Sequence, residues 1–392
     1  MKILFTGGGT GGHIFPIIAI CRELRNISSG KELRFFYIGP RDEISSIFLV
    51  REGIKLKNIL AGKIRRYFGI KSLFLNIVDV LFKIPIGLIQ AFFYIFFLSP
   101  DFIFSKGGYG SLPAVICGWL LGTPIFLHES DVIPGLANRF LSRFAVEIFV
   151  SFPFQKTEHF PPPKKISVGN PIRQEILEGS KEEAKTLFNL SGEKPVVLIL
   201  GGSQGSQRIN DVLLQILPEL LTDFETIHQC GGKNFKEVEA ESKVVIGEEN
   251  KFSSSPFATA RVTEDLKKYY HLFPFLDEIE LSHAYSVANL IVSRAGSGSI
   301  FEISAVSKPS ILIPLPEAAQ NHQVENAYAY AKNSACLIIE EINLAPHFFL
   351  DRLRYLFSHP SEMEKMAKSA REFSRPRAAE VIASYIFEYL KL

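Results

Sequence analysis

Short runs of apolar residues alternate with longer amphipathic segments along the first half of the chain. Each run is bounded by glycine, proline or polar residues, and the segment after it is long enough to form a helix. Such runs are typical of strands buried on both faces of a parallel sheet that helices cover. We therefore predict five strands, namely KILFT (2–6), LRFFYIG (33–39), DFIFS (101–105), PIFLHE (124–129) and EIFVS (147–151).

The pattern restarts after a proline-rich connection, FPPPKKISVGNPIR (160–173). Strands followed by glycine or serine turns are predicted again, whereas the polar stretch 233–262 predicts loops and 376–390 predicts an amphipathic helix. The fold class is therefore α/β, with two Rossmann-like, doubly wound parallel-sheet domains. Ligands of such sheets bind beyond the carboxyl ends of the strands, so two facing halves imply a cleft. The strands of the second half are PVVLIL, ETIHQ, NLIVS and SILIPLP.

Composition limits the class of protein. Of 392 residues, 47% are hydrophobic and 21% are charged, which is enough to bury the cores of two domains. The formal net charge of +2 gives no reason to expect nucleic acid as a partner. The four cysteines lie far apart without CxxC spacing, so we predict reduced core thiols of a cytosolic protein rather than disulfides or a zinc site.

One segment, 72–100, is unusually apolar. Its longest charge-free run, 84–100, contains Pro85, Gly87 and Gln90 and falls short of the about 20 apolar residues that a membrane span needs, so we predict no transmembrane helix. The alternatives are a buried helix beside a solvated loop and contact of 63–100 with an anionic membrane surface, and we favour membrane contact. The basic residues that would meet headgroups are Lys63, Arg65, Arg66 and Lys71, and Tyr67 and Phe68 would lie at the interface.

The glycine-rich stretch FTGGGTGGHIFP (5–16) lies between a predicted strand and a predicted helix. Glycines there let the backbone approach a phosphate and direct free amides at it. Gly7, Gly9 and Gly12 satisfy GxGxxG, but Asp42 comes too late for the acid of a dinucleotide site, so we expect no nicotinamide, flavin or other cofactor. His13 is a candidate general base, and a purely structural role in the turn is the alternative.

Further turns follow other strands. SKGGYGS (105–111) and HES (128–130) would line one pocket together with His13, although Gly107 and Gly108 could equally serve turn geometry alone. GGSQGS (201–206) suits a diphosphate, and SRAGSGSIFE (293–302) adds an arginine and a glutamate. Glu302 could bind a ribose diol or merely cap its helix. No cluster of residues has the spacing of a metal site.

Taken together, the motifs resemble the MurG family, which transfers N-acetylglucosamine (GlcNAc) from UDP-GlcNAc to undecaprenyl-diphosphate-MurNAc-pentapeptide (lipid I) and so makes lipid II for peptidoglycan. The resemblance implies a GT-B fold with an acceptor-binding, membrane-associating domain (1–162) and a UDP-GlcNAc-binding domain (163–370). A C-terminal helix (371–392) would pack back toward the first domain. Family members attach peripherally to the cytoplasmic membrane face. The motifs are TGGGTGGHIFP, GGYGS, HES…PGLAN, GNPIR, GGSQGS and SRAGSGSIFEI.

The resemblance also implies roles for single residues. His13 or Asp131 would be the catalytic base, and the acceptor would contact Gly107, Gly108, Tyr109, Ser111, His128 and Glu129. UDP-GlcNAc would contact Thr10, Gly11, Gly12, Arg173, Ser203, Gln204, Leu276, Arg294, Ser299, Glu302, His322 and Gln323.

The chain departs from the family pattern at three places. The frequent HEQN is HESD here, His322 replaces one of two glutamines, and Gly298 stands where leucine is common. Two alternative functions follow: a UDP-sugar transferase with another lipid acceptor, and a weakly active scaffold of the cell envelope. We expect an inverting transfer that needs no metal, in which a base deprotonates the acceptor hydroxyl and backbone amides stabilise the leaving diphosphate.

Overall fold

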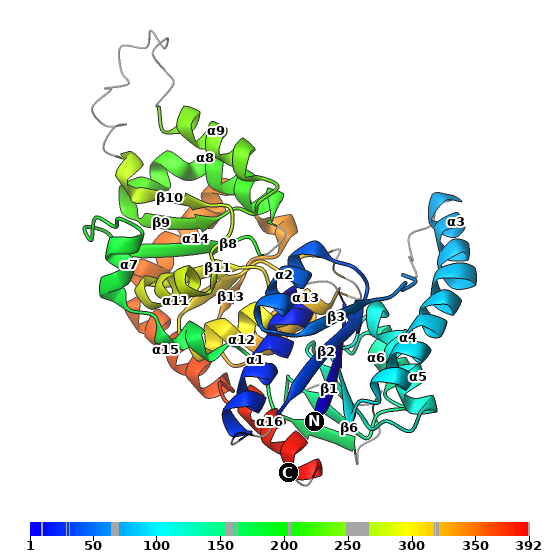
Figure 1. The fold of residues 1–392 in the computed structure, drawn as a ribbon. Helices are drawn as coiled ribbons and strands as arrows, with labels where there is room; N and C mark the ends of the chain where they lie inside the picture. The colour runs from blue at the N-terminus through cyan, green and yellow to red at the C-terminus, as the bar shows by residue number, and fades with distance from the viewer. Residues whose placement is uncertain are drawn as a thin grey trace, which may run out of the picture. The chain divides into compact units, whose positions relative to one another are not determined.

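The computed structural model divides the chain into two compact units, Met1–Arg173 with Arg375–Leu392, and Gln174–Ser374 (Figure 1). Residues 163–173, which we predicted to belong to the second domain, are thus part of the first unit. Each unit is built on one parallel sheet with helices packed against it. The structure describes residues 1–8, 11–28, 30, 32–63, 70–153, 160, 164–202, 205–247, 266–316, 318 and 321–390.

The first unit contains a seven-stranded sheet in the order β3-β2-β1-β4-β5-β6-β7. All five strands predicted in this half are confirmed. Two edge strands were not predicted, because β3 (KLKN) is mostly exposed and polar and β7 is three residues long. The strands are β1 (Lys2–Thr6), β2 (Arg34–Gly39), β3 (Lys55–Asn58), β4 (Phe102–Ser105), β5 (Ile125–Glu129), β6 (Glu147–Val150) and β7 (Lys165–Ser167).

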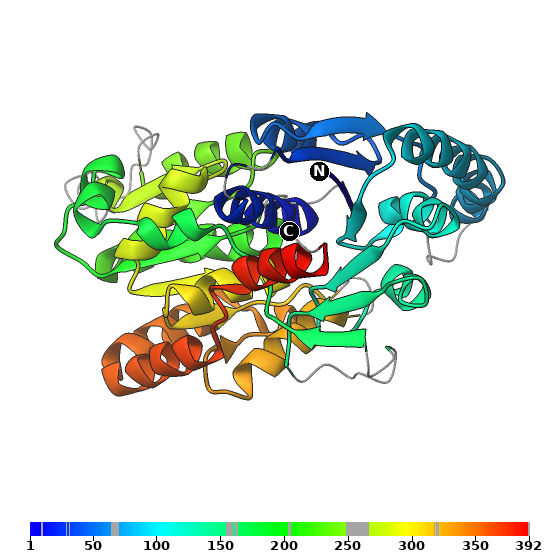
Figure 2. The same cartoon turned by 60° about the horizontal axis from the view of Figure 1, so that its bottom comes forward.

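Both faces of this sheet are buried. Ile3 and Phe5 of β1 belong to one hydrophobic cluster and Leu4 to another, as the alternation of side chains along a strand requires. The first cluster includes α1 and the C-terminal helix α16, which lie side by side (Figure 2). The helices are α1 (Gly11–Ile27), α2 (Glu43–Arg51), α3 (Ile70–Val78), α4 (Ile84–Leu98), α5 (Leu112–Leu120), α6 (Leu136–Leu141) and α16 (Ala378–Tyr389).

The apolar segment forms one long helix. A π-helical turn, Asp79–Lys83, joins α3 to α4, and Ser72–Leu98 is long and apolar enough by length and composition to cross a membrane. Our argument that the segment is too short was therefore wrong, because the helix continues through Pro85 at the start of α4. The two charged residues Asp79 and Lys83 within it form an ion pair at 2.6 Å. One face nevertheless packs on the sheet domain: Gly87 lies against the Leu60 carbonyl.

The second unit contains a six-stranded sheet in the order β10-β9-β8-β11-β12-β13. The four strands predicted here are confirmed, and the edge strands β10 and β13 were missed. The predicted loops in 233–262 are wrong for α9, because its three valines and one phenylalanine are interspersed among charged residues over three turns. The strands are β8 (Val196–Leu200), β9 (Glu225–Gln229), β10 (Tyr270–Phe273), β11 (Leu290–Ser293), β12 (Ser310–Leu312) and β13 (Leu337–Ile338).

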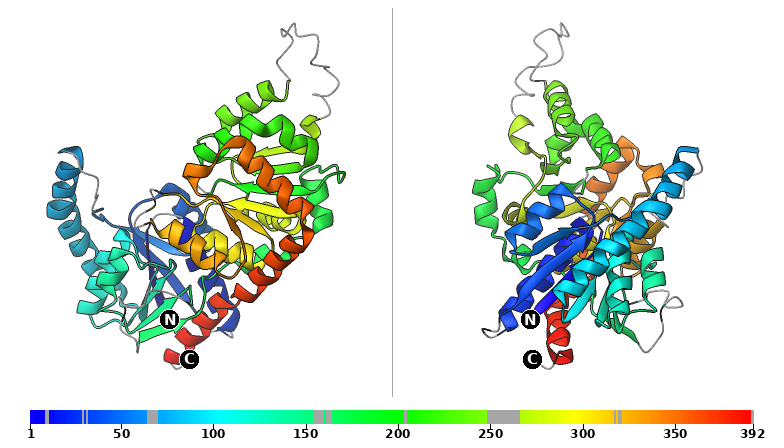
Figure 3. Two further views of the ribbon diagram at one scale, coloured as in Figure 1. Left: turned by 180° about the vertical axis from the view of Figure 1, so that it is seen from behind. Right: turned by 45° about the vertical axis from the view of Figure 1, so that its right-hand side comes forward.

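Helices cover this second sheet as well. Leu213, Leu217 and Leu220 of α8 join Leu350 and Leu353 of α14 in one core, and α15 packs on α12 and α14 (Figure 3). The helices are α7 (Lys181–Leu187), α8 (Gln207–Asp223), α9 (Phe235–Val245), α11 (Glu278–Val287), α12 (Ser297–Ala305), α13 (His322–Ala331), α14 (Pro346–Ser358) and α15 (Pro360–Phe373).

Candidate functional site

Three of the predicted loops are neighbours in the first unit. Strand β4 pairs with both β1 and β5 in parallel, so the loops that follow these three strands lie at one edge of the sheet. A Cβ atom on Gly108 would lie 2.9 Å from Cε1 of His13, and a Cβ on Gly7 would lie 3.3 Å from Cβ of Lys106. The strand order thus brings together residues that are about a hundred positions apart in the chain.

His13 is held by its own loop. The backbone N–H of Gly8 donates to Nδ1 of His13 at 3.0 Å. A neutral imidazole with an accepting Nδ1 carries its hydrogen on Nε2, so in this arrangement Nε2 of His13 is a donor. A Cβ on Gly8 would lie 2.3 Å from Nδ1, which is why a residue without a side chain is needed here. The hydroxyl of Tyr37 donates to the Gly7 carbonyl at 3.1 Å and supports the same loop.

The loop after β4 depends on two glycines with positive φ. Gly107 and Gly108 have φ values of 83° and 80°, which other residues rarely adopt. Asn138 of α6 packs so closely on Gly107 that a Cβ there would lie 2.0 Å from its Oδ1. Ser111 is buried and donates to the Gly108 carbonyl at 2.8 Å, whereas Tyr109 is partly exposed. Ser111 therefore shapes the loop, and Tyr109 is accessible to a ligand.

The segment after β5 is organised by a buried carboxylate. Glu129 accepts hydrogen bonds from the backbone of Asp131 (3.0 Å) and Gly135 (3.0 Å) and from the Asn138 amide (2.8 Å). Burial raises the pKa of Glu129 to about 7, and the Asp131 carboxylate acts in the same direction. Asp131 is partly exposed, so it can reach a ligand that Glu129 cannot.

His128 is completely buried on β5. Burial and the Lys106 charge hold the pKa of its imidazole well below the usual range, so His128 stays neutral. Its Nε2 lies 3.2 Å from the Gly169 carbonyl. His128 was predicted to contact the acceptor, but a completely buried side chain can only support the loops of the predicted acceptor site.

Lys106 is a residue that the sequence analysis missed. Its ammonium is buried among His128, Ser130 and Asn170. The available indication was that Lys106 is the charged residue of SKGGYGS and directly follows a fully buried strand. A charged side chain at such a position is rarely buried without partners.

In the second unit, the hydrogen bonds of Gln229 connect three loops. It lies at the end of β9, accepts from the Leu276 backbone at 3.0 Å and donates to the Gly202 carbonyl at 3.3 Å. Gly205 has a φ of 78°, and a Cβ there would lie 2.5 Å from the Cys230 carbonyl. Leu276 is buried and Phe275 is exposed, so a ligand could reach the Phe275 ring but not the Leu276 side chain.

Arg294 holds the first turn of α8 to two other segments. Its guanidinium donates to the Ser206 hydroxyl at 2.6 Å and to the Ile313 carbonyl at 3.2 Å, and it forms an ion pair with Glu341. Ser206 is the N-cap residue of α8. Arg294 thus fixes the turn that follows β8, and this structural role accounts for its charge.

The start of α12 is the other helix N-terminus predicted to face a diphosphate. Ser299 and Glu302 of α12 are partly exposed, and Glu302 accepts from the Tyr285 hydroxyl at 3.1 Å. His322 and Gln323 begin α13, and Gln323 accepts from the Leu315 backbone at 3.1 Å. This bond orients the Gln323 amide so that its NH2 group remains for a ligand.

The predicted UDP-GlcNAc residues are divided between the two units. Gly11 and Gly12 begin α1 in the first unit, and Arg173 lies there with its guanidinium 4.1 Å from the centre of the Phe15 ring. The other described donor residues are in the second unit. The predictions for Thr10, Ser203, Gln204, Arg65, Arg66, Tyr67 and Phe68 lie outside the described residues.

Two further observations concern cysteines and metals. All four cysteines are free and buried, as predicted. Within the described part of the chain, no three or more His, Cys, Asp or Glu side chains gather as a metal ion would require.

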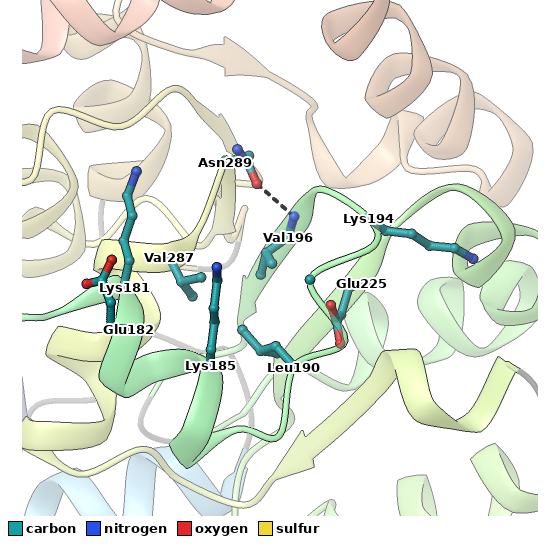
Figure 4. A pocket seen from close by; sticks show the side chains of 10 residues that line it. Lys181, Glu182, Lys185, Leu190, Lys194, Val196, Glu225, Val287 and Asn289 are labelled. Atoms are coloured by element: carbon teal, nitrogen blue, oxygen red, sulfur yellow. Dashed lines mark hydrogen bonds between the residues drawn. The ribbon is translucent and has the colours of Figure 1, made fainter.

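A cavity of about 210 Å³ opens at the opposite, amino-terminal edge of the second sheet (Figure 4). Val196 at the start of β8 donates there to the Asn289 side chain at 2.8 Å, and Glu225 begins β9. Lys181 and Lys185 of α7 also line it. Because ligands of doubly wound sheets bind at the carboxyl ends of the strands, this cavity is not the candidate donor site.

Comparison with known proteins agrees with this arrangement over the whole chain. Residues 3–150 match the glycosyltransferase family 28 N-terminal domain and residues 196–382 match the glycosyltransferase family 28 C-terminal domain. The UDP-N-acetylglucosamine--N-acetylmuramyl-(pentapeptide) pyrophosphoryl-undecaprenol N-acetylglucosamine transferase of Clostridium tetani is 35% identical over 99% of this chain and 98% of its own length. A Bacillus cereus enzyme of the same name is 34% identical over 99% of both chains.

Solved structures show the same fold. The crystal structure of Acinetobacter baumannii MurG superposes with a TM-score of 0.70 and 24% identity, over 99% of each chain. UDP-GlcNAc 2-epimerase from Neisseria meningitidis, bound to UDP-GlcNAc, superposes with a TM-score of 0.63 and 15% identity over 99% of this chain and 100% of the other. The predicted pair of Rossmann-like domains with GT-B-like neighbours is therefore confirmed.

Proposed function

Because this chain belongs to the MurG family of glycosyltransferases, we propose that it transfers GlcNAc from UDP-GlcNAc to the MurNAc 4-hydroxyl of lipid I and produces lipid II. The observation that carries this proposal is the full-length similarity, at 35% identity, to a transferase whose name specifies both substrates. The glycine-rich loops at the carboxyl edges of both sheets support it, since each unit then offers one ligand site.

The second unit is suited to the UDP moiety. The turn after β8 leads into α8 and the turn after β11 leads into α12, so two helix N-termini point free amides and positive dipole ends to the same sheet edge. These groups would stabilise the charge that develops on the leaving diphosphate. Glu302 would bind the ribose hydroxyls, and the Gln323 amide would contact the sugar.

In the first unit we assign the base to Asp131 rather than to His13. The Gly8 N–H occupies Nδ1 of His13, so the imidazole presents Nε2–H and can donate to an oxygen of the acceptor. A carboxylate only accepts, and Asp131 lies on the loop that Glu129 fixes. Attack of the deprotonated hydroxyl on the anomeric carbon, with UDP leaving from the opposite face, inverts the configuration.

Membrane attachment follows from the chemistry of a lipid-linked acceptor. Only 17% of the most apolar stretch of the helix Ser72–Leu98 is buried in the protein. Its exposed side chains would insert into the boundary region of a bilayer, on the cytoplasmic side where a nucleotide sugar is available, while the buried face stays on the protein. The most exposed are Leu73, Phe74, Leu81, Phe82, Ile89, Phe93, Phe96 and Phe97.

The test is UDP release from UDP-GlcNAc in the presence of EDTA, with and without a polyprenyl-diphosphate-MurNAc-peptide in detergent. We expect release that depends on the acceptor, together with GlcNAc covalently attached to the lipid. Binding of UDP-GlcNAc without transfer to this acceptor would contradict the proposed acceptor and would favour another lipid substrate. Failure to bind UDP-GlcNAc would refute the proposal altogether.

A further inference from the structure

One lysine lies directly behind the loop that carries His13. Lys106 follows β4, and its backbone N–H donates to the Thr6 carbonyl of β1 at 2.8 Å. Only 2% of its surface is exposed, so its ammonium does not reach bulk solvent or a substrate. Because burial of a charge is unfavourable unless hydrogen bonds and opposite charges compensate, the surroundings of Lys106 show what it does.

The Lys106 ammonium has three hydrogen-bonding neighbours for its three N–H groups. Nζ lies 2.6 Å from Nδ1 of His128 and 3.1 Å from Oδ1 of Asn170, and it also donates to the Ser130 hydroxyl oxygen. Nε2 of His128 faces the Gly169 carbonyl, which can only accept. Nε2 therefore carries the imidazole hydrogen, and Nδ1 accepts from Lys106.

This arrangement also determines how Ser130 is used. A hydroxyl group has one hydrogen and two lone pairs, and one lone pair of Ser130 is occupied by Lys106. The hydrogen must then point away from the ammonium. Ser130 immediately precedes the partly exposed Asp131 and is itself 8% exposed, so its hydroxyl lies just beneath the surface of this segment.

Charged and titratable groups lie on several sides of Lys106. Burial lowers the pKa of Lys106 to about 7, while the carboxylates of Glu129 and Asp131 act in the opposite direction. The other titratable groups near it are His128, which is neutral, and His13. The Lys106 charge is thus attracted to the carboxylates of Glu129 and Asp131, which lie at the end of β5 and just after it.

We propose that Lys106 is a positioning residue of the transfer reaction: its buried ammonium fixes the orientation of the Ser130 hydroxyl and of the adjoining Asp131 segment toward the acceptor. The inference rests on the proposed function, since it concerns the acceptor side of the same reaction. It also accounts for the HESD sequence, because a serine is short enough to accept from Lys106 where a longer amide is frequent in the family.

The first test is Lys106→Met, which keeps the length of the side chain and removes its charge. The kcat and KM for the lipid acceptor are measured at saturating UDP-GlcNAc, together with the Kd of UDP-GlcNAc. We expect a roughly 10–100-fold loss of kcat/KM for the acceptor, mainly through a higher KM, because Ser130 and the Asp131 segment lose the group that positions them. The Kd should change less than about twofold.

A matched control separates this role from mere stability. Lys308 of the second unit is also largely buried and donates to the Ser286 and Ala288 carbonyls at 2.9 and 2.7 Å. Lys308→Met should lower the melting temperature without changing the acceptor KM. An unchanged acceptor KM in a folded Lys106→Met variant would overturn the proposal.

A second variant decides the question if Lys106→Met does not fold. Ser130→Ala removes the hydroxyl and almost no volume, and it should raise the acceptor KM about 5–10-fold with kcat nearly unchanged. An unchanged acceptor KM in this variant would also refute the proposed role. Absence of transfer by the wild-type protein at every pH would instead refute the proposed function, and this inference with it.

Discussion

The backbone N–H of Gly8 donates to Nδ1 of His13 across 3.0 Å. This bond leaves the imidazole with a donor at Nε2 and is the physical reason for assigning the base to Asp131. Asp131→Asn should therefore lower kcat by about 10²–10⁴-fold with the Kd of UDP-GlcNAc nearly unchanged. His13→Gln, which retains an N–H donor, should lose clearly less. The single-turnover rate of GlcNAc transfer measures both, and a larger loss in His13→Gln would reverse the assignment.

The membrane proposal predicts a separable loss of lipid binding. Phe93 and Phe97 are 55% and 77% exposed on α4 and stack on each other at 6.4 Å. Replacing both with serine should weaken binding to phosphatidylglycerol–phosphatidylethanolamine vesicles about tenfold or more, because each buried phenyl ring contributes about 1.5–3 kcal/mol. Co-sedimentation measures this.

The control for membrane binding is Ile342→Ser in the second unit, since Ile342 is 87% exposed but far along the chain from α4. It should leave vesicle binding as in the wild type. Equal vesicle binding by the wild type and the double variant would contradict the proposed membrane face.

A glycine in α12 offers a stabilising substitution. Gly298 has a helical backbone, and a Cβ added there would meet nothing within 4 Å. Gly298→Ala should raise the free energy of unfolding by about 0.4–1 kcal/mol, because it restricts the unfolded chain.

Gly122 is the matched control for Gly298, since a Cβ added there would also meet nothing within 4 Å but its φ is 74°. Gly122→Ala should destabilise by about 1–2 kcal/mol. Urea denaturation measures both, and equal effects would disprove the argument.

The raised pKa of Glu129 predicts a pH-dependent contribution to stability. Its value of about 7 in the folded protein lies above the ordinary value of 4.5, so folding takes up a proton between these pH values. The stabilisation is fully present below about pH 4.5 and is lost as the pH rises through about 7. The stability difference between the wild type and Glu129→Gln should therefore shrink from about pH 5 to pH 8, as urea denaturation would show.

A carboxylate with the opposite shift serves as control. Hydrogen bonds from Tyr269 and Lys268 lower the pKa of Glu193, so its contribution is lost as the pH falls. The difference between the wild type and Glu193→Gln should grow as the pH rises to about 4.5 and stay level from pH 5 to pH 8. A decrease from pH 5 to pH 8 in this variant as well would contradict the assignment for Glu129.

Much of the fold is encoded locally. The central strand VVLIL is apolar throughout, and KILFT is apolar in its three middle residues, because helices cover both faces of a parallel sheet. The glycine turns after these strands mark the carboxyl edge. The edge strands β3 and β13 escaped prediction because an edge strand is only partly buried and needs no continuous apolar run. The order of the motifs along the chain was enough to identify the family.

The remaining features of the candidate site depend on pairing between strands that are distant in the chain. The sequence marks His13, Gly108 and Asp131 as separate features, but only the parallel pairing of β1, β4 and β5 makes their loops neighbours. Hydrogen bonds are even less visible in a sequence. The accepting Nδ1 of His13 and the three partners of Lys106 depend on side-chain directions that neighbouring strands impose. Residue types and spacing therefore indicate which chemistry is available, whereas protonation states and donor directions arise from contacts between segments distant in the chain.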